Sequence, residues 1–246
     1  MNIIKKFKIV FIFSLLIFGV CSLFLSCSKD EATEPTYTCA ACTRTPDALP
    51  ANDTSAKGIY KGIVVGSSGT LSINIQNGSS AITGTLVIDG VAVALTSSVT
   101  YVDGQPYLAP FTGTYNNSPI SITFSVAVGG GTPTVISSDI PGHPNAVFTI
   151  AKETSTSLIE AFEGTYSKSG ETGIFNIILS SGLGAWGGIA KENGSSVVED
   201  ISGTYINNQV IDENGTVVGV ITGDVLQGSF TDSSNTIVTT IGYRTL

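Results

Sequence analysis

Two cysteines three positions apart are the first residues whose spacing could support chemistry. The motif Cys39-Ala40-Ala41-Cys42 would suggest covalent haem if a His followed it, but Thr43 follows. A zinc site needs about four ligands, and His143 is the only His in the chain. A thioredoxin-type redox motif opens a helix after a strand, and this polar, proline-containing sequence provides no such context. We therefore expect a local disulfide between Cys39 and Cys42 in an oxidising compartment, and no metal site.

His143 and two acidic pairs are the remaining candidates for catalysis. His143 lies between two prolines, and no Ser or Cys has the sequence context of a nucleophile elbow, so we expect an exposed loop histidine and no catalytic triad. Neither Glu199-Asp200 nor Asp212-Glu213 can itself form a glycosidase dyad, because adjacent strand residues point to opposite faces. We expect solvated strand ends or turns at both pairs. The sequence predicts no enzyme activity and no cofactor.

The single tryptophan, Trp186, is the candidate ligand contact. It alternates with Gly184, Gly188 and Ala190, so a large ring would lie among small residues on one face of a strand. Such a ring either fills a gap in the core or lies in a shallow groove where a sugar can stack on it. The core is the commoner place for it, and the sequence leaves both alternatives open.

The composition favours β-structure and excludes some partners. Only 12% of the residues are charged and 28 of the 246 are glycine, which argues against helical bundles and coiled coils. Removal of an export signal with three of the 11 basic residues would leave 19 acidic residues and a net charge of about −11. Nucleic acid is therefore a poor partner.

The N-terminus has the layout of a secretory signal. Lys5, Lys6 and Lys8 precede an uncharged apolar run from Ile9 to Leu25, which also leaves an uncleaved membrane anchor as an alternative. The sequence Leu25-Ser26-Cys27 resembles the lipobox of bacterial lipoproteins, which implies cleavage before Cys27 and lipidation of its thiol. Phe24 departs from the Leu preferred in that pattern.

The residues after Cys27 carry a second resemblance. Ser28, Lys29, Asp30 and Glu31 resemble the export signal of Bacteroidota lipoproteins that are sent to the outer face of the outer membrane. This resemblance implies a lipid-anchored protein that faces the cell exterior, and it covers only the first 31 residues or so. We expect residues 1–26 to be the signal peptide and residues 27–57, which contain three prolines, to be the lipidated cysteine and a disordered tether.

Alternating apolar and polar residues dominate from Gly58 onward. The clearest example is Ile120, Ile122, Phe124, Val126 and Val128, which indicates a half-buried strand. Turn pairs that supply positive φ angles separate such runs: Asn77-Gly78, Asp89-Gly90, Asp103-Gly104, Asn193-Gly194 and Asn214-Gly215. The sequence therefore predicts an all-β protein with an up-and-down antiparallel meander.

A weak internal repeat divides the β region in two. A shift of 104 positions places six residues of the first half on identical residues of the second, four of them glycines. We expect two tandem meander units of about eight short strands each, at 58–152 and 164–246, as small barrels or sandwiches. The connector 153–163 would contain a short helix, since Ser157 and Glu160 have capping-box spacing. In turn spacing alone the units resemble avidin-like and lipocalin-like barrels, and no ligand-binding residue of those families can be assigned.

These observations predict a non-enzymatic, lipid-anchored surface protein that binds an extracellular glycan, protein or envelope component. The alternative is a carrier of a small apolar ligand inside a barrel. Against the carrier, the bulky series from Ile120 to Val128 would fill an eight-stranded interior. A hydrolase and a membrane-spanning barrel are the less favoured alternatives.

Overall fold

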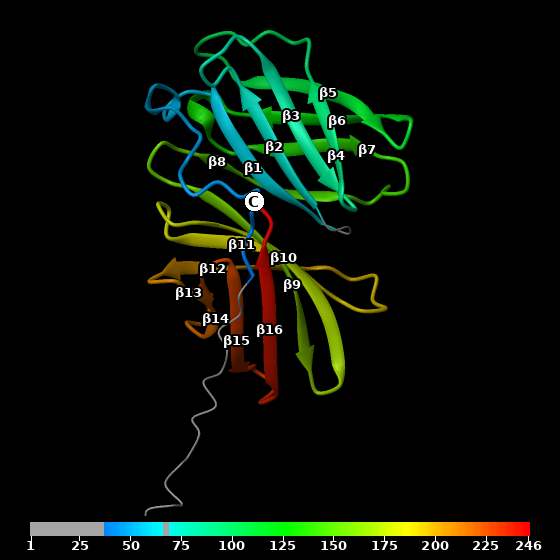
Figure 1. Ribbon diagram of the computed structural model, residues 1–246, viewed down its shortest axis with the longest axis vertical. Coiled ribbons are helices and arrows are strands. Elements are labelled where there is room, and N and C mark those ends of the chain that lie inside the picture. The colour runs from blue at the N-terminus through cyan, green and yellow to red at the C-terminus, as the bar shows by residue number, and fades with distance from the viewer. Residues whose placement is uncertain (1–36, 66–68) are drawn as a thin grey trace, which may run out of the picture. The chain divides into compact units, whose positions relative to one another are not determined.

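The computed structural model describes residues 37–65 and 69–246, which belong to one compact unit, Tyr37–Leu246. The predicted signal peptide, Cys27 and Ser28-Lys29-Asp30-Glu31 lie outside the described residues. The fold class is all-β, as predicted. The described residues form two eight-stranded antiparallel meanders that follow each other along the chain (Figure 1). Besides the strands, the described residues form two short 3-10 helices, η1 (Pro50–Asn52) and η2 (Val128–Gly130).

The first meander is an eight-stranded sheet with the order β7-β6-β5-β4-β3-β2-β1-β8. Its edge strands β7 and β8 approach each other without pairing, so the sheet is nearly closed. The pairing of β4 with β5 is limited to Thr96 and Thr112. The strands are β1 (Gly58–Val65), β2 (Gly69–Ile75), β3 (Ile82–Ile88), β4 (Val91–Thr96), β5 (Tyr107–Tyr115), β6 (Ser118–Val126), β7 (Thr134–Asp139) and β8 (Val147–Glu153).

The second meander is a closed barrel, because its last strand pairs with its first. Closure removes the free edges that an open sheet exposes. The strands are β9 (Ile159–Lys168), β10 (Glu171–Ser180), β11 (Ala185–Glu192), β12 (Glu199–Ile206), β13 (Gln209–Asp212), β14 (Val217–Thr222), β15 (Val225–Thr231) and β16 (Ile237–Arg244). The 104-residue shift of the internal sequence repeat aligns β2 with β10. Each is the second strand of its meander.

The predicted turn glycines adopt the backbone conformation that their sequence indicated. Gly78, Gly90, Gly104, Gly194 and Gly215 all have φ between 75° and 84°. Tight hairpins need such angles because they match the twist of the flanking strands. The sequence argument missed the turns at Asn116-Asn117 and Asn207-Asn208, where four asparagines also have positive φ.

The predicted alternation in β6 is confirmed except at its end. Ile120, Ile122, Phe124 and Val126 are buried inside the first meander. Val128 is 57% exposed, so its predicted place in the series is wrong. The strand ends at Val126 and the chain enters η2, whose interior residue Gly129 has φ of 79° and breaks the extended conformation.

The predicted helix in the connector 153–163 is wrong. Strand β8 ends at Glu153 and β9 begins at Ile159, so the barrel starts before residue 164. The capping-box residues make tertiary contacts instead: the Ser157 hydroxyl bonds that of Ser180, and Glu160 pairs with Arg244 at 2.9 Å. Long-range contacts therefore override the local helix signal.

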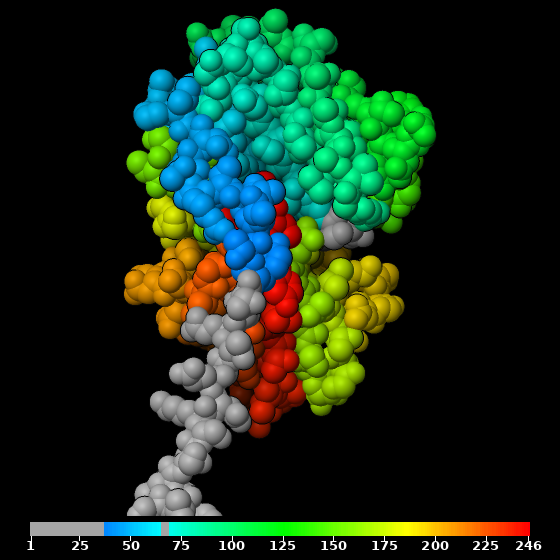
Figure 2. Space-filling model, viewed as in Figure 1, coloured from blue at the N-terminus to red at the C-terminus, as the bar shows by residue number. Residues whose placement is uncertain are grey.

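Residues 37–57, which we name the N-terminal strap, are packed against the strands, so the predicted tether is wrong for this stretch. Figure 2 shows the strap in blue on the surface of the β-structure. The Tyr37 hydroxyl donates to the carbonyl of Arg244 at 2.9 Å. Further along, the Asp53 carboxylate accepts hydrogen bonds from Ser155 N–H and Oγ–H at 2.8 and 2.7 Å. The strap thus contacts both the barrel and the β8–β9 connection.

Each meander has its own apolar core, and a third cluster joins them. This joining cluster contains outward-facing residues of β1, β9, β10 and β11: Ile63, Ile159, Ala161, Ile178 and Ile189. The side-chain amide of Asn176 donates to the carbonyl of Val64 at 3.0 Å beside it. A buried ion pair between Lys61 and Glu153, at 2.8 Å, lies on the first meander. In the part of the chain that the structure describes, no helix is long and apolar enough to cross a bilayer.

Candidate ligand cavity

The barrel formed by β9–β16 contains a cavity of about 480 Å³. All eight of its strands contribute to the lining, which identifies the cavity as the interior of the barrel. An eight-stranded barrel is just wide enough to be filled by side chains or to hold one small ligand. The apolar lining residues are Phe175, Ile177, Trp186, Ala190, Ile201, Val210, Val218, Leu226, Phe230 and Val238.

Glycines on neighbouring strands explain why this interior is not filled. A β-carbon at Gly173 would overlap the ring of Tyr166, and one at Gly203 would lie 2.9 Å from Nε1 of Trp186. A β-carbon at Gly164 would in the same way meet the ring of Phe175. The rings thus occupy the places that side chains of the adjacent strand would take. They lie against the wall of the barrel, and space remains at its centre.

Trp186 lies in the wall of this cavity. Its side chain is 8% exposed, and its Nε1–H donates to the carbonyl of Ile211 at 2.8 Å. Of the two alternatives left by the sequence, the ring belongs to the core cluster of the barrel and not to a groove on its outer face. The Trp186 ring also lines the cavity, so a ligand inside the barrel would contact it.

The open end of the barrel is lined by acidic residues. Both predicted acidic pairs, Glu199-Asp200 and Asp212-Glu213, lie at strand ends as expected, and all four residues line the cavity. Glu171 and Glu192 join them there, with Lys168 as the basic residue of the lining. The sequence argument missed Glu171 and Glu192. The available signal was their alternation with Phe175 and Ala190, which places them on the inner face.

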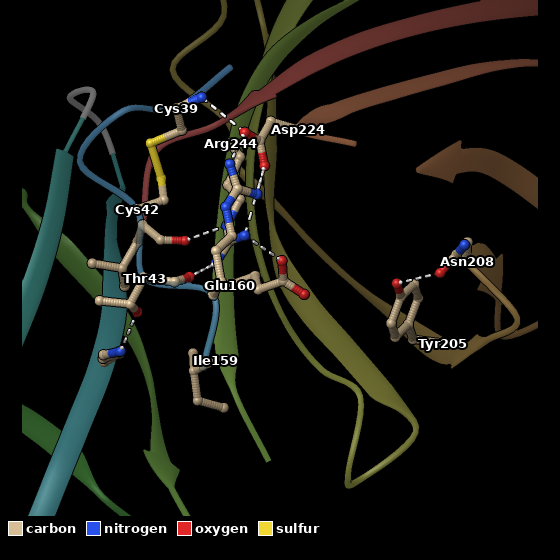
Figure 3. A network of polar contacts seen from close by, with 12 residues as sticks. Cys39, Cys42, Thr43, Ile159, Glu160, Tyr205, Asn208, Asp224 and Arg244 are labelled. Atoms are coloured by element: carbon tan, nitrogen blue, oxygen red, sulfur yellow. Dashed lines mark hydrogen bonds and ion pairs between the residues drawn. A yellow bond between two sulfur atoms is a disulfide. The ribbon is translucent and has the colours of Figure 1, made fainter. Parts of the chain in front are cut away.

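The opposite end of the barrel is closed by a buried ionic network (Figure 3). Arg244 is 2% exposed, and its guanidinium pairs with Glu160 at 2.9 Å and with Asp224 at 3.6 Å. Arg44 of the strap donates to both oxygens of the Asp224 carboxylate. These hydrogen bonds hold the pKa of Asp224 below its usual value, whereas burial raises the pKa of Glu160.

The predicted Cys39–Cys42 disulfide is present in the strap at this closed end. The Cys39 N–H donates to Oδ2 of Asp224 at 2.8 Å, and the Thr43 carbonyl accepts from the Arg244 guanidinium at 2.6 Å. The disulfide therefore holds a short turn of the strap that covers the network (Figure 3).

The other sequence candidates lie away from the cavity. The His143 side chain is only 13% exposed and pairs with Asp89 at 3.2 Å, so the expected exposed histidine is wrong. Its ring also contacts Tyr115 of the first meander. Among the described residues, no group of three or more His, Cys, Asp or Glu side chains is arranged to hold a metal ion.

A second hollow, of about 490 Å³, lies over β9, β10 and β16. Apart from Ile241, its lining consists of small or polar residues and Tyr166. We take the barrel interior as the site, because all eight strands contribute to its lining.

The fold and the cavity define the class of this protein, a tandem antiparallel β-meander protein with a hollow closed barrel. Comparisons with protein-family models, curated proteins and solved structures found no match for the chain.

Proposed function

We propose that this protein is a non-enzymatic, lipid-anchored binding protein of the cell surface, and that its β9–β16 barrel takes up a small, largely apolar ligand. The cavity of about 480 Å³, lined by all eight strands, carries this proposal. Its volume falls within the range of small-molecule sites, about 300 to 1,000 Å³. The bulky residues of β6 fill the interior of the first meander. Carriage of a small apolar ligand is therefore proposed for the second meander alone.

Trp186 provides a direct test of uptake. It is the only tryptophan of the chain and lines the cavity, so a ligand in the barrel should change its emission. The protein for this test is the soluble form Ala32–Leu246, which contains the whole compact unit. We expect the neutral fluorescent probe N-phenyl-1-naphthylamine to bind with a change in Trp186 emission. Native mass spectrometry of the form purified from cells would identify a retained ligand.

A variant that fills the cavity tests where the probe binds. Ala190 lines the cavity, and Ala190→Phe would place a ring in the lumen. The matched control is Ala92→Phe on β4, where the alanine is exposed. We expect probe binding to be lost in Ala190→Phe at an unchanged melting temperature and to be retained in Ala92→Phe. Equal binding by both variants, or no binding by the unmodified protein, would contradict uptake by the barrel and favour a glycan or protein partner on an outer surface.

The lipid anchor is the second part of the proposal and rests on Cys27 and the residues around it. Three acyl chains on one cysteine would give a durable anchor, since each buried methylene contributes about 0.8 kcal/mol. Cys27→Ser should abolish incorporation of an alkyne-labelled fatty acid and release the protein from the membrane fraction. Cys21→Ser, in the same leader, is the matched control and should change neither. Surface exposure can be measured by protease accessibility on intact cells.

A further inference from the structure

We propose that the ligand of the barrel is an amphipathic organic cation, whose protonated amine lies among Glu171, Glu192 and Glu199 at the open end. Its hydrocarbon body would lie against the apolar wall. This inference rests on the proposed uptake of a small ligand by the barrel and adds the chemical class of that ligand.

The three glutamates come from three consecutive strands and share the inner face. Glu171 begins β10, Glu192 ends β11 and Glu199 begins β12, so all three lie at the same end of the barrel. Side chains of a strand alternate between its two faces. Glu171 is therefore on the face of Phe175, Glu192 on that of Trp186, and Glu199 on that of Ile201. All three line the cavity.

The strand register places the three glutamates near one another, because Glu192 pairs with Gly173, two residues from Glu171, and Glu199 pairs with Ala190, two residues from Glu192. Tyr166 lines the same cavity, and its pKa is raised first by burial and then by the negative charges of Glu192, Glu199 and Glu171. Lys168 opposes this effect. The direction of this pKa shift agrees with the strand register, which places the three carboxylates at one end of the barrel.

Of the other charged groups that line the mouth, Lys168, Asp212 and Glu213 have partners in the structure, whereas Asp200 has none among the described residues. Lys168 pairs with Asp232 at 2.5 Å. Asp212 accepts hydrogen bonds from the backbone N–H groups of its own turn, and Glu213 accepts from Ser202. Among the described residues, by contrast, the side-chain carboxylates of Glu171, Glu192 and Glu199 form no hydrogen bond or ion pair. A cation placed among these three carboxylates would offset their mutual repulsion.

The apolar lining below the carboxylates favours an organic cation over an inorganic ion as the ligand. Phe175, Trp186, Leu226, Phe230 and Val238 present apolar surface to the cavity. An inorganic ion would leave this surface uncovered, whereas a hydrocarbon body would remove it from water. The aromatic rings add attraction for a nearby ammonium group. The chain as a whole has a net charge of −8, which favours the approach of cations.

The test compares three ligands that share one hydrocarbon body. Decylamine, 1-decanol and decanoate, each below its micelle-forming concentration, compete with N-phenyl-1-naphthylamine for the form Ala32–Leu246. We expect the amine to bind about tenfold more tightly than the alcohol, since exposed charge pairs each contribute modestly, and the anion to bind most weakly. The preference for the amine should decrease as the salt concentration rises.

A triple variant, Glu171→Gln, Glu192→Gln and Glu199→Gln, isolates the role of the carboxylates. It should bring the ratio of amine to alcohol affinity close to one and leave the affinity of the neutral probe unchanged. The matched control removes three acidic charges from the first meander by Asp89→Asn, Asp103→Asn and Asp139→Asn. The control should retain the preference for the amine. Melting curves of both variants verify that they are folded.

The outcomes separate this inference from the proposed function. If the probe binds but the amine and the alcohol bind equally, the cationic ligand is refuted and uptake by the barrel is retained. An amine preference that survives in the triple variant, or that falls equally in the control, would also refute the role of the three glutamates. If neither the probe nor any of the three ligands binds, the proposed function itself fails, and the cationic ligand fails with it.

Discussion

The two meanders have the same number of antiparallel strands but different interiors. The core cluster of the first has 20 buried side chains among the described residues and that of the second has eight, so only the first is filled. Tilted and edge-to-face rings occupy the centre of the first, where the ring centroid of Phe124 lies 5.1 Å from that of Tyr60 and 6.3 Å from that of Phe111. In the second, rings lie against glycines of the wall. The first interior is thus filled by side chains, whereas the second encloses a cavity.

The two ends of the second barrel differ as strongly. At the closed end, acidic residues are matched by Arg44 and Arg244 under the strap. At the open end, Glu171, Glu192 and Glu199 line the cavity. Charges that are matched within the protein are typical of structural networks, whereas charges directed to a cavity are typical of binding sites. Substitutions can test whether the two interiors differ in packing and whether the two ends of the β9–β16 barrel differ in charge pairing.

The largest difference should come from removing one phenylalanine ring from each interior. Phe124 is fully buried in the first meander, so Phe124→Ala should lower the free energy of unfolding by about 4 kcal/mol. Phe230 is half-buried beside the cavity, so Phe230→Ala should cost about 1 kcal/mol. Urea denaturation followed by circular dichroism measures both. Equal losses would mean that the second interior is packed as tightly as the first.

Breaking the closed end should have the next largest effect. Asp224 is 3% exposed, and Asp224→Ala would leave the buried Arg244 without one of its two carboxylate partners. We expect a loss of about 3 kcal/mol in the free energy of unfolding, because an uncompensated buried charge is costly. Urea denaturation measures this loss. Asp139→Ala, on the exposed edge of β7, is the control and should change stability by less than about 0.5 kcal/mol.

Asp224 should also make the free energy of unfolding depend on pH. The pKa of Asp224 is lowered in the folded protein, mainly by its hydrogen bonds with Arg44. The ionised Asp224 carboxylate therefore stabilises the folded protein fully at pH values above about 4, the pKa of an aspartate in the unfolded chain. This stabilisation is lost as the pH falls through the lower pKa of Asp224 in the folded protein. Asp224→Asn should flatten this acid loss. An unchanged slope of stability against pH in that variant would contradict the assignment.

The local sequence predicted the strands and turns, but it could not predict what fills each interior. Alternation and turn glycines are local signals, and they located five of the connections between consecutive strands. The tether prediction failed at residues 37–57 because long-range contacts, such as that of Arg44 with Asp224, order the strap. The cavity was missed because its existence depends on barrel closure and on which glycine each ring faces. Trp186 was identified as a candidate contact because it was the one large ring among small residues.

Removing the disulfide tests how the strap closes the barrel. Cys39→Ser with Cys42→Ser should lower the free energy of unfolding by about 2 kcal/mol, a value typical of a short loop. The effect should be smaller than that of Asp224→Ala, because the ionic network under the strap remains. Thermal melts of the variant and of the reduced unmodified protein should agree. A larger loss than that of Asp224→Ala would show that the network depends on the disulfide.

The smallest effect on stability should come from the carboxylates of the open end. The glutamines of the triple variant at Glu171, Glu192 and Glu199 keep the size of the side chains and remove three charges. Because these groups are exposed, the free energy of unfolding should change by less than about 0.5 kcal/mol, with a slight gain from reduced repulsion. Urea denaturation at low salt measures this change. A loss as large as that of Asp224→Ala would mean that the open end is a structural network like the closed end, because carboxylates that stabilise the fold would not be left for a ligand.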